Sequence, residues 1–186
     1  MENEYEQFRK QIVHLQGYLE LFKVEFFDRE GFKRFADNLC SNVLDHSHVY
    51  ITGYFSETIR EELERFLKIQ GRRLFLICQE LDINNKRDRK NLEVLRKLQK
   101  VGAEIKVNNR LHARMLVAFN STEPIRGLLI LGSFDFNTEC MGKERYDAGI
   151  KTQHPDLVRA AVHLFEQIWN ESESTELNDQ YPEKKE

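Results

Sequence analysis

The stretch NNRLHARMLVAF (residues 108–119), followed by LLILGSFDFN (residues 128–137), decides the fold of this chain. Both segments contain apolar runs long enough for a buried strand. His112 and Arg114 interrupt the first run, and a Gly-Ser pair ends the second. Buried strands normally exclude such groups, because burying a polar group without partners costs free energy. We therefore expect two strands that each bring polar groups to one local site.

The alternation of a strand predicts which of these polar residues lie together. Residues two apart face the same way, so His112 and Arg114 share one face of the first expected strand. Ser133, Asp135 and Asn137 share a face of the second, which turns polar at its end. A guanidinium offers a planar fork of donors to phosphate oxygens, and an imidazole can carry a proton near neutral pH. The pattern therefore favours a pocket for an anion.

A second interpretation of the same residues stays open at this point. His112 is then a histidine of the core whose hydrogen bonds are satisfied, and Arg114 forms a plain salt bridge with Asp135. Composition and alternation alone do not separate this structural role from an anion site.

The segments on either side alternate between strand and helix patterns. Short apolar runs predict strands, and apolar residues repeating every three to four positions predict helices, with Ser56 as an N-cap and with Gly71 and Gly102 just past helix ends. Strands separated by helices of this length predict an α/β sandwich, in which helices flank a largely parallel or mixed sheet. We expect further strands within 48–55, 72–81 and 103–108, and helices within 56–71, 86–102 and 154–169.

The two ends of the chain differ from this central pattern. Residues 1–47 read as an N-terminal helical segment, with a first amphipathic helix from Tyr5 to Phe22 that either packs on its own domain or forms a dimer. Residues 48–170 form the expected main domain. Residues 171–186 are polar and have almost nothing to bury, so they are expected to be a disordered tail.

Composition limits the classes of function. The 186 residues carry a net charge of -3, and no apolar run approaches the roughly 18 residues of a membrane span. Cys40, Cys78 and Cys140 are widely spaced, which favours reduced thiols in a cytoplasmic protein. A nucleic-acid site would need a local basic patch. KRDRK (residues 86–90) is one candidate, but Asp88 dilutes its charge and a solvated helix face is favoured.

Three short motifs resemble those of the phospholipase D superfamily, which carries His-x-Lys, then Gly-Ser-x-Asn, then often an Asn-Tyr-Glu-like segment. The chain has HAR at 112–114, GSFD at 132–135 and RYDAGI at 145–150. The resemblance extends from about Val49 to Trp169 and implies the phospholipase D-like α/β/α sandwich with a mixed sheet. In that family one His attacks phosphorus and forms a phosphohistidine, while a second His protonates the leaving oxygen, with no metal or other cofactor.

The resemblance also implies partners and roles. A family active site uses two such motifs, and this chain has one, so it implies a homodimer with His112 of both subunits face to face. His112 becomes the nucleophile or the acid, Arg114 the phosphate clamp, and Ser133 a donor to the anion. Asp147 stands where a Glu often orients the His. The implied activity is that of a phosphodiesterase or nuclease acting on a phosphodiester or other anionic ligand, with nucleic acid among the candidates.

Two substitutions in the motif favour a different function. Arg114 replaces the Lys, and Asp135 replaces the Asn, which puts a carboxylate where a substrate phosphate would lie. Two like charges about 4 Å apart repel by about 4 kcal/mol at an effective dielectric constant of about 20. Pairing of Asp135 with Arg114, or its protonation, would remove this repulsion, and Asn137 is the candidate to supply the missing amide. The alternative is a catalytically impaired binding or regulatory protein that holds a phosphate-type ligand.

Overall fold

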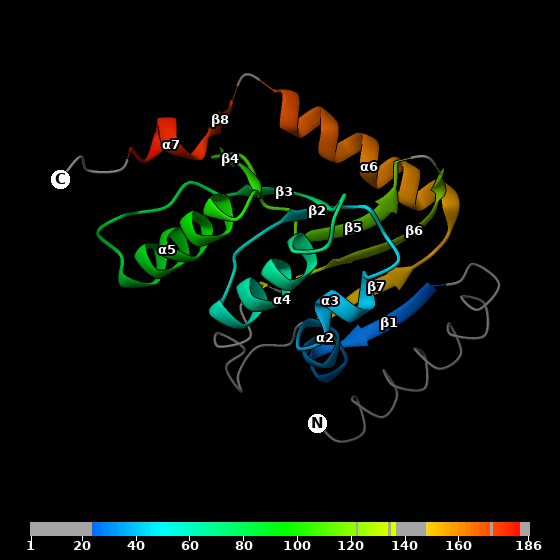
Figure 1. The fold of residues 1–186 in the computed structure, drawn as a ribbon. Helices are drawn as coiled ribbons and strands as arrows, with labels where there is room; N and C mark the ends of the chain where they lie inside the picture. Colours follow the sequence, from blue (N-terminus) through cyan, green and yellow to red (C-terminus); the bar gives the residue numbers. More distant parts are fainter. Residues whose placement is uncertain (1–23, 122, 134, 137–147, 172, 183–186) are drawn as a thin grey trace.

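An eight-stranded mixed sheet forms the centre of the molecule (Figure 1). The computed structural model describes residues 24–182 apart from 122, 134, 137–147 and 172. The strand order is β1-β7-β6-β5-β2-β3-β4-β8, in which β2, β3 and β4 run parallel and the other neighbours antiparallel. The strands are β1 (Val24–Asp28), β2 (His48–Thr52), β3 (Arg73–Cys78), β4 (Glu104–Asn108), β5 (Met115–Asn120), β6 (Glu123–Gly132), β7 (Ala148–Thr152) and β8 (Ser174–Glu176).

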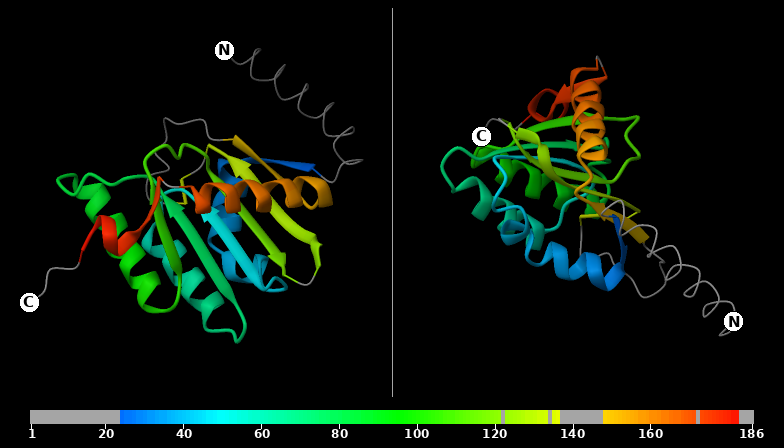
Figure 2. Two further views of the ribbon diagram at one scale, coloured as in Figure 1. Left: turned by 90° about the horizontal axis from the view of Figure 1, so that it is seen from above. Right: turned by 90° about the vertical axis from the view of Figure 1, so that its right-hand side faces the viewer.

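Helices cover both faces of this sheet, as Figures 1 and 2 show. Among the described residues, helices α2 to α5 pack on one face, where Leu177 of α7 joins the same core, and the long helix α6 packs on the other. The predicted α/β/α sandwich with a mixed sheet is therefore confirmed. The helices are α2 (Arg29–Ala36), α3 (Leu39–Asn42), α4 (Glu57–Leu67), α5 (Lys86–Lys100), α6 (Pro155–Asn170) and the short α7 (Leu177–Gln180).

Strand β2 shows why the apolar runs are continuous. Val49 and Ile51 are fully buried and join the core beneath α2 to α5, whereas Tyr50 points to the other side and packs in the core beneath α6. Because helices cover both faces, a central strand needs apolar residues at almost every position. The same division holds in β5, where Leu116 and Val117 belong to opposite cores.

The structure confirms the residues that the sequence predicted at the helix ends. Ser56 is the N-cap of α4, and its Oγ accepts a hydrogen bond from the Ile59 amide at 3.4 Å. Gly71 and Gly102 follow α4 and α5 with φ angles of 80° and 105°. Only glycine adopts that left-handed conformation without steric cost. Gly102 directly follows Val101, the C-cap of α5, and reverses the chain there, whereas Gly71 lies three residues beyond Lys68, the C-cap of α4.

The two strands quoted from the sequence are shorter than expected at the ends that matter for the site. β5 begins at Met115, so His112 and Arg114 lie in the irregular segment before it and share no strand face. β6 ends at Gly132, so Ser133 and Asp135 lie beyond it. The polar side chains therefore lie just outside the strands: two precede β5 and two follow β6.

The chain ends extend the sheet past the expected domain of residues 48–170. β1 pairs with β7 at one edge, and β8 pairs with β4 at the other. The expectation of a disordered tail is wrong over 174–181, because Leu177 is fully buried and the Tyr181 hydroxyl donates to the Leu81 carbonyl at 3.0 Å. The amphipathic helix expected from Tyr5 to Phe22 lies outside the described residues. None of the helices in the described part of the chain is long and apolar enough to span a membrane.

Candidate functional site

Thr52, at the end of β2, holds the segment that leads into β5. Its side chain is fully buried, and its Oγ1 donates to the Ala113 carbonyl at 2.9 Å and accepts from the Met115 amide at 3.0 Å. These two bonds fix the backbone on both sides of Arg114. The Arg114 carbonyl in turn accepts from the Gly132 amide at 3.2 Å, which ties the segment to the end of β6.

Arg114 and Asp135 lie together and form the centre of the site. Arg114 Nε donates to Asp135 Oδ1 at 2.7 Å, and Arg87 Nη2 donates to Asp135 Oδ2 at 2.7 Å. The carboxylate is 17% exposed and therefore bridges two guanidinium groups in partly dehydrated surroundings. The salt bridge between Arg114 and Asp135 is confirmed. With two cations and one anion, the cluster keeps one positive charge.

Gly53 makes room for the Arg114 side chain. Its φ angle is 150°, a conformation that residues with side chains rarely adopt. A Cβ atom at this position would lie 3.2 Å from both Arg114 Cδ and a ring carbon of Phe136. The glycine therefore lets the guanidinium reach Asp135 across the end of β2.

Arg87 is also held from its other side. Its guanidinium carbon lies 4.6 Å from the centroid of the Tyr54 ring, a cation–π contact. The Tyr54 hydroxyl bonds Asp88, which also accepts from the Asp82 amide at 2.8 Å. These neutral donors hold the Asp88 side chain in place without offsetting the charge that it brings to KRDRK.

The remaining predicted residues are only partly brought into this cluster. His112 is exposed, and its carbonyl oxygen accepts from Arg114 Nη1 at 3.5 Å, so the interpretation as a core histidine is wrong. The Ser133 hydroxyl accepts from the Ala148 amide at 3.3 Å, which joins the end of β6 to the start of β7. Asn137 and Asp147 lie outside the described residues.

Sequence reasoning missed Arg87, although it bonds the same carboxylate as Arg114. Arg87 lies 48 positions before Asp135 and within a run of charges typical of a solvated helix. Thr52 and Gly53 were also missed, because a Thr-Gly pair after a strand carries no chemistry of its own. The glycine at the strand's end was the one available signal, since it indicates close approach of another group.

Comparisons with known proteins agree with this architecture. No protein-family model and no curated protein matches the sequence. Polyphosphate kinase from Porphyromonas gingivalis is similar in structure, with a TM-score of 0.63, 17% identity, and coverage of 82% of this chain but only 28% of the kinase. Nuc, a phospholipase D family member from Salmonella typhimurium, gives a TM-score of 0.61 at 14% identity over 82% of this chain and 96% of Nuc. TrmBL2, an archaeal chromatin protein, gives 0.56 at 10% identity over 94% and 62%.

The layers, the strand order and the charged cluster at the ends of the central strands β2, β5 and β6 define a three-layer α/β/α protein with a candidate anion site. Its architecture is the phospholipase D-like fold, as the likeness to Nuc shows.

Proposed function

We propose that the chain binds a phosphate-type anion at the Arg87–Asp135–Arg114 cluster and does not cleave it. The observation that supports this function is that Asp135 accepts a hydrogen bond from each of the two arginines, one at each carboxylate oxygen. A catalyst needs its cations free to stabilise charge that develops on phosphorus. Here a carboxylate of the protein already occupies them, while the remaining guanidinium N–H groups and the residual positive charge still favour an anion.

One of the neighbours in structure has a matching role. TrmBL2 is described as a chromatin protein with a novel mode of DNA binding. A nucleic-acid strand carries a regular row of phosphates, and arginine is well suited to contact them. DNA is therefore the first ligand to test, as a single-stranded and as a double-stranded oligonucleotide.

The binding experiment compares two arginine variants. Fluorescence anisotropy with a labelled single-stranded oligonucleotide is expected to show binding that weakens about tenfold in Arg114→Gln, because a charge-assisted contact is lost. Arg110→Gln is the matched control: Arg110 is 71% exposed, lies four residues earlier and pairs with Glu173 at 3.0 Å. Equal loss in both variants would point to net charge alone and would contradict the proposed site.

A second function is favoured by the exposure of His112. In this proposal the chain is a metal-independent phosphodiesterase that works as a homodimer. His112 of one subunit attacks phosphorus, and a P–N bond forms as the P–O bond to the leaving group breaks. His112 of the partner subunit gives its proton to the leaving oxygen, and water then hydrolyses the phosphohistidine. Ser133 would donate to the phosphate, Asp147 would orient His112, and Asn137 would supply the amide.

Turnover separates the two functions. A phosphodiesterase should hydrolyse a generic phosphodiester in the presence of a chelator and lose that activity in His112→Ala. Binding without turnover supports the first proposal. The double variant Asp135→Asn with Arg114→Lys restores the motif of the family, and it should then gain hydrolysis if those two residues are what prevents it.

A further inference from the structure

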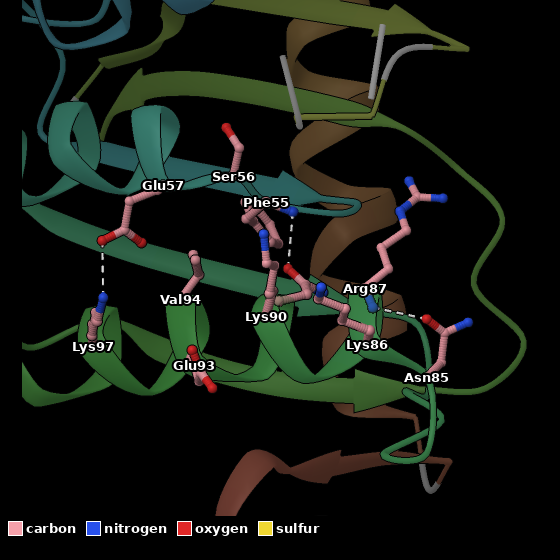
Figure 3. Close-up of a pocket in the computed structure, with 11 residues that line it drawn as sticks. Phe55, Ser56, Glu57, Asn85, Lys86, Arg87, Lys90, Glu93, Val94 and Lys97 are labelled. Carbon is pink, nitrogen blue, oxygen red and sulfur yellow. Dashed lines mark hydrogen bonds and ion pairs between the residues drawn. The ribbon is translucent and has the colours of Figure 1, made fainter. Parts of the chain in front are cut away.

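A cavity of about 670 Å³ opens between the start of α4 and one side of α5, next to the cluster described above (Figure 3). Phe55, Ser56 and Glu57 line it from the start of α4. Helix α5 lines it from the other side, from Lys86 to Lys97, and Arg87 is the residue that the cavity shares with the cluster. Sites for small organic molecules usually have volumes of about 300–1,000 Å³, so the cavity has the size of such a site.

Two buried hydrogen-bond donors in this cavity have no acceptor among the described residues. Asn91 is only 2% exposed, and its Oδ1 accepts from the Phe55 amide at 3.0 Å. That bond fixes the orientation of the side chain, so the atom without a partner is the donor Nδ2. Arg87 Nε, in the wall of the same cavity, also lacks a partner. Both atoms favour oxygen acceptors, because a buried donor without a partner destabilises the fold.

The charges around the cavity favour an anionic acceptor. Lys86, Lys90 and Lys97 line it together with Arg87, against two carboxylates, Glu57 and Glu93. The start of α4 also lines the cavity, so the positive end of that helix dipole favours an anion there.

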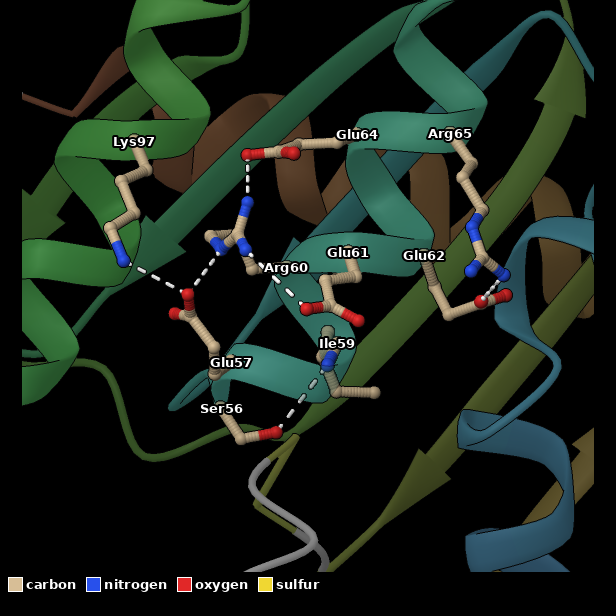
Figure 4. Close-up of polar contacts among 9 residues, drawn as sticks. All are labelled: Ser56, Glu57, Ile59, Arg60, Glu61, Glu62, Glu64, Arg65 and Lys97. Carbon is tan, nitrogen blue, oxygen red and sulfur yellow. Dashed lines mark hydrogen bonds and ion pairs between the residues drawn. The ribbon is translucent and has the colours of Figure 1, made fainter.

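Glu57 repels an anion only weakly, because two cationic side chains already pair with its carboxylate. Its Oε1 accepts from Lys97 Nζ at 2.9 Å and lies 2.9 Å from Arg60 Nε (Figure 4). Burial would raise the pKa of Glu57, but the bonds from Lys97 and Arg60 outweigh burial and lower it. The carboxylate therefore stays ionised and paired, which leaves Lys86 and Lys90 to face a ligand.

We propose that this cavity binds the phosphate group of a small phosphorylated molecule of about nucleotide size. Phosphate oxygens would accept from Asn91 Nδ2 and Arg87 Nε, and the ammonium groups of Lys86 and Lys90 would neutralise its charge. The site adjoins the one centred on Arg114 and shares Arg87 with it, but it would hold an effector whether or not the Arg114 cluster binds a ligand.

The side-chain amide of Asn91 is itself the reporter for the test. In 1H–15N correlation spectra of the whole chain, adenosine monophosphate and inorganic phosphate should shift the Asn91 side-chain resonances and the amides of the first turn of α5 in a saturable manner. Adenosine, which lacks the phosphate, should leave them in place. The shifts should persist in Arg114→Gln, which distinguishes this site from the first proposal.

Matched variants distinguish a specific binding site from non-specific electrostatic attraction of the phosphate to the basic helix α5. Lys86→Gln with Lys90→Gln should weaken binding of adenosine monophosphate at least about tenfold, because two charge-assisted contacts are lost. Arg89→Gln removes one positive charge, as each of the two lysine changes does, from an exposed position of α5 outside the cavity, and it should change binding less than twofold. Asn91→Asp keeps the oxygen that accepts from Phe55 and replaces the donor with an anion, which should abolish binding.

Three results would overturn the proposal. These are shifts with adenosine equal to those with its monophosphate, equal losses in Arg89→Gln and in the lysine variants, and shifts that grow linearly without saturation. Lys86 and Lys90 are exposed, so their variants are expected to fold even where Asn91→Asp does not.

Discussion

Asp135 determines the chemistry of the charged cluster because arginine side chains bind both of its carboxylate oxygens. The sequence already suggested that a carboxylate here would either repel a phosphate or pair with Arg114. The structure selects the pair and adds Arg87. That third member could not be predicted, since contacts between residues 48 apart depend on how α5 packs against the sheet.

Asp135→Asn should separate the structural effect of this carboxylate from its effect on binding. The two guanidinium groups lose charge-assisted bonds, so we expect the free energy of unfolding to fall by about 1–2 kcal/mol. The same change frees the arginines, so oligonucleotide affinity should rise about tenfold. Urea denaturation and fluorescence anisotropy measure the two effects. A loss of both stability and affinity would mean that Asp135 positions the arginines for the ligand.

Tyr50 gives a test of core electrostatics on the opposite face. Burial raises the pKa of its phenol to about 12, and the nearby Glu166 carboxylate, which accepts its hydrogen bond at 3.4 Å, adds to the effect. The unfolded chain releases this proton near pH 10, so the folded state holds more protons between about pH 10 and 12 and loses stability as the pH rises. Urea denaturation should show a shallower loss in Tyr50→Phe. Identical slopes would exclude Tyr50 as the source.

At the scale of elements, periodicity predicted the parts of the fold that are buried on both sides. Strands β2 to β6 and helices α4 to α6 each carry an apolar pattern of their own. β1, β7 and β8 do not, because several of their side chains are exposed and their backbones are held by pairing with distant strands. Pairing of that kind leaves no periodic signal in a single sequence.

The segment after α6 offers a direct check of this point. Leu177→Ala removes a fully buried side chain and should cost about 2–5 kcal/mol, which is the usual range for such cavities in a core. Asn178→Ala changes an exposed neighbour and should cost less than about 0.5 kcal/mol. Thermal or urea denaturation gives both values. Equal, small effects would show that the segment does not pack on the core.

For the whole molecule, the central question is whether one chain suffices for a site. The single motif around His112 implies that a phosphodiesterase would need two subunits, whereas anion binding at the Arg114 cluster needs one. The exposed position of His112 is compatible with contact across a two-fold axis.

Sedimentation velocity at micromolar concentration gives the corresponding prediction. If the chain is a phosphodiesterase, it should sediment as a dimer, and hydrolysis should fall on dilution as dimers separate. A monomer that retains full turnover would exclude a site shared between two copies of His112. A monomer that binds oligonucleotide without turnover is the result expected from the first proposal.

The position of β1 and β8 has a practical consequence for anyone who shortens the protein. Both outermost strands come from the segments before and after residues 48–170, so trimming the chain to that range would strip both borders of the sheet at once. The amide and carbonyl groups of β7 and β4 would then be open to strands of other molecules, a common origin of insoluble material. Keeping residues 24–182 together should preserve a well-behaved sample.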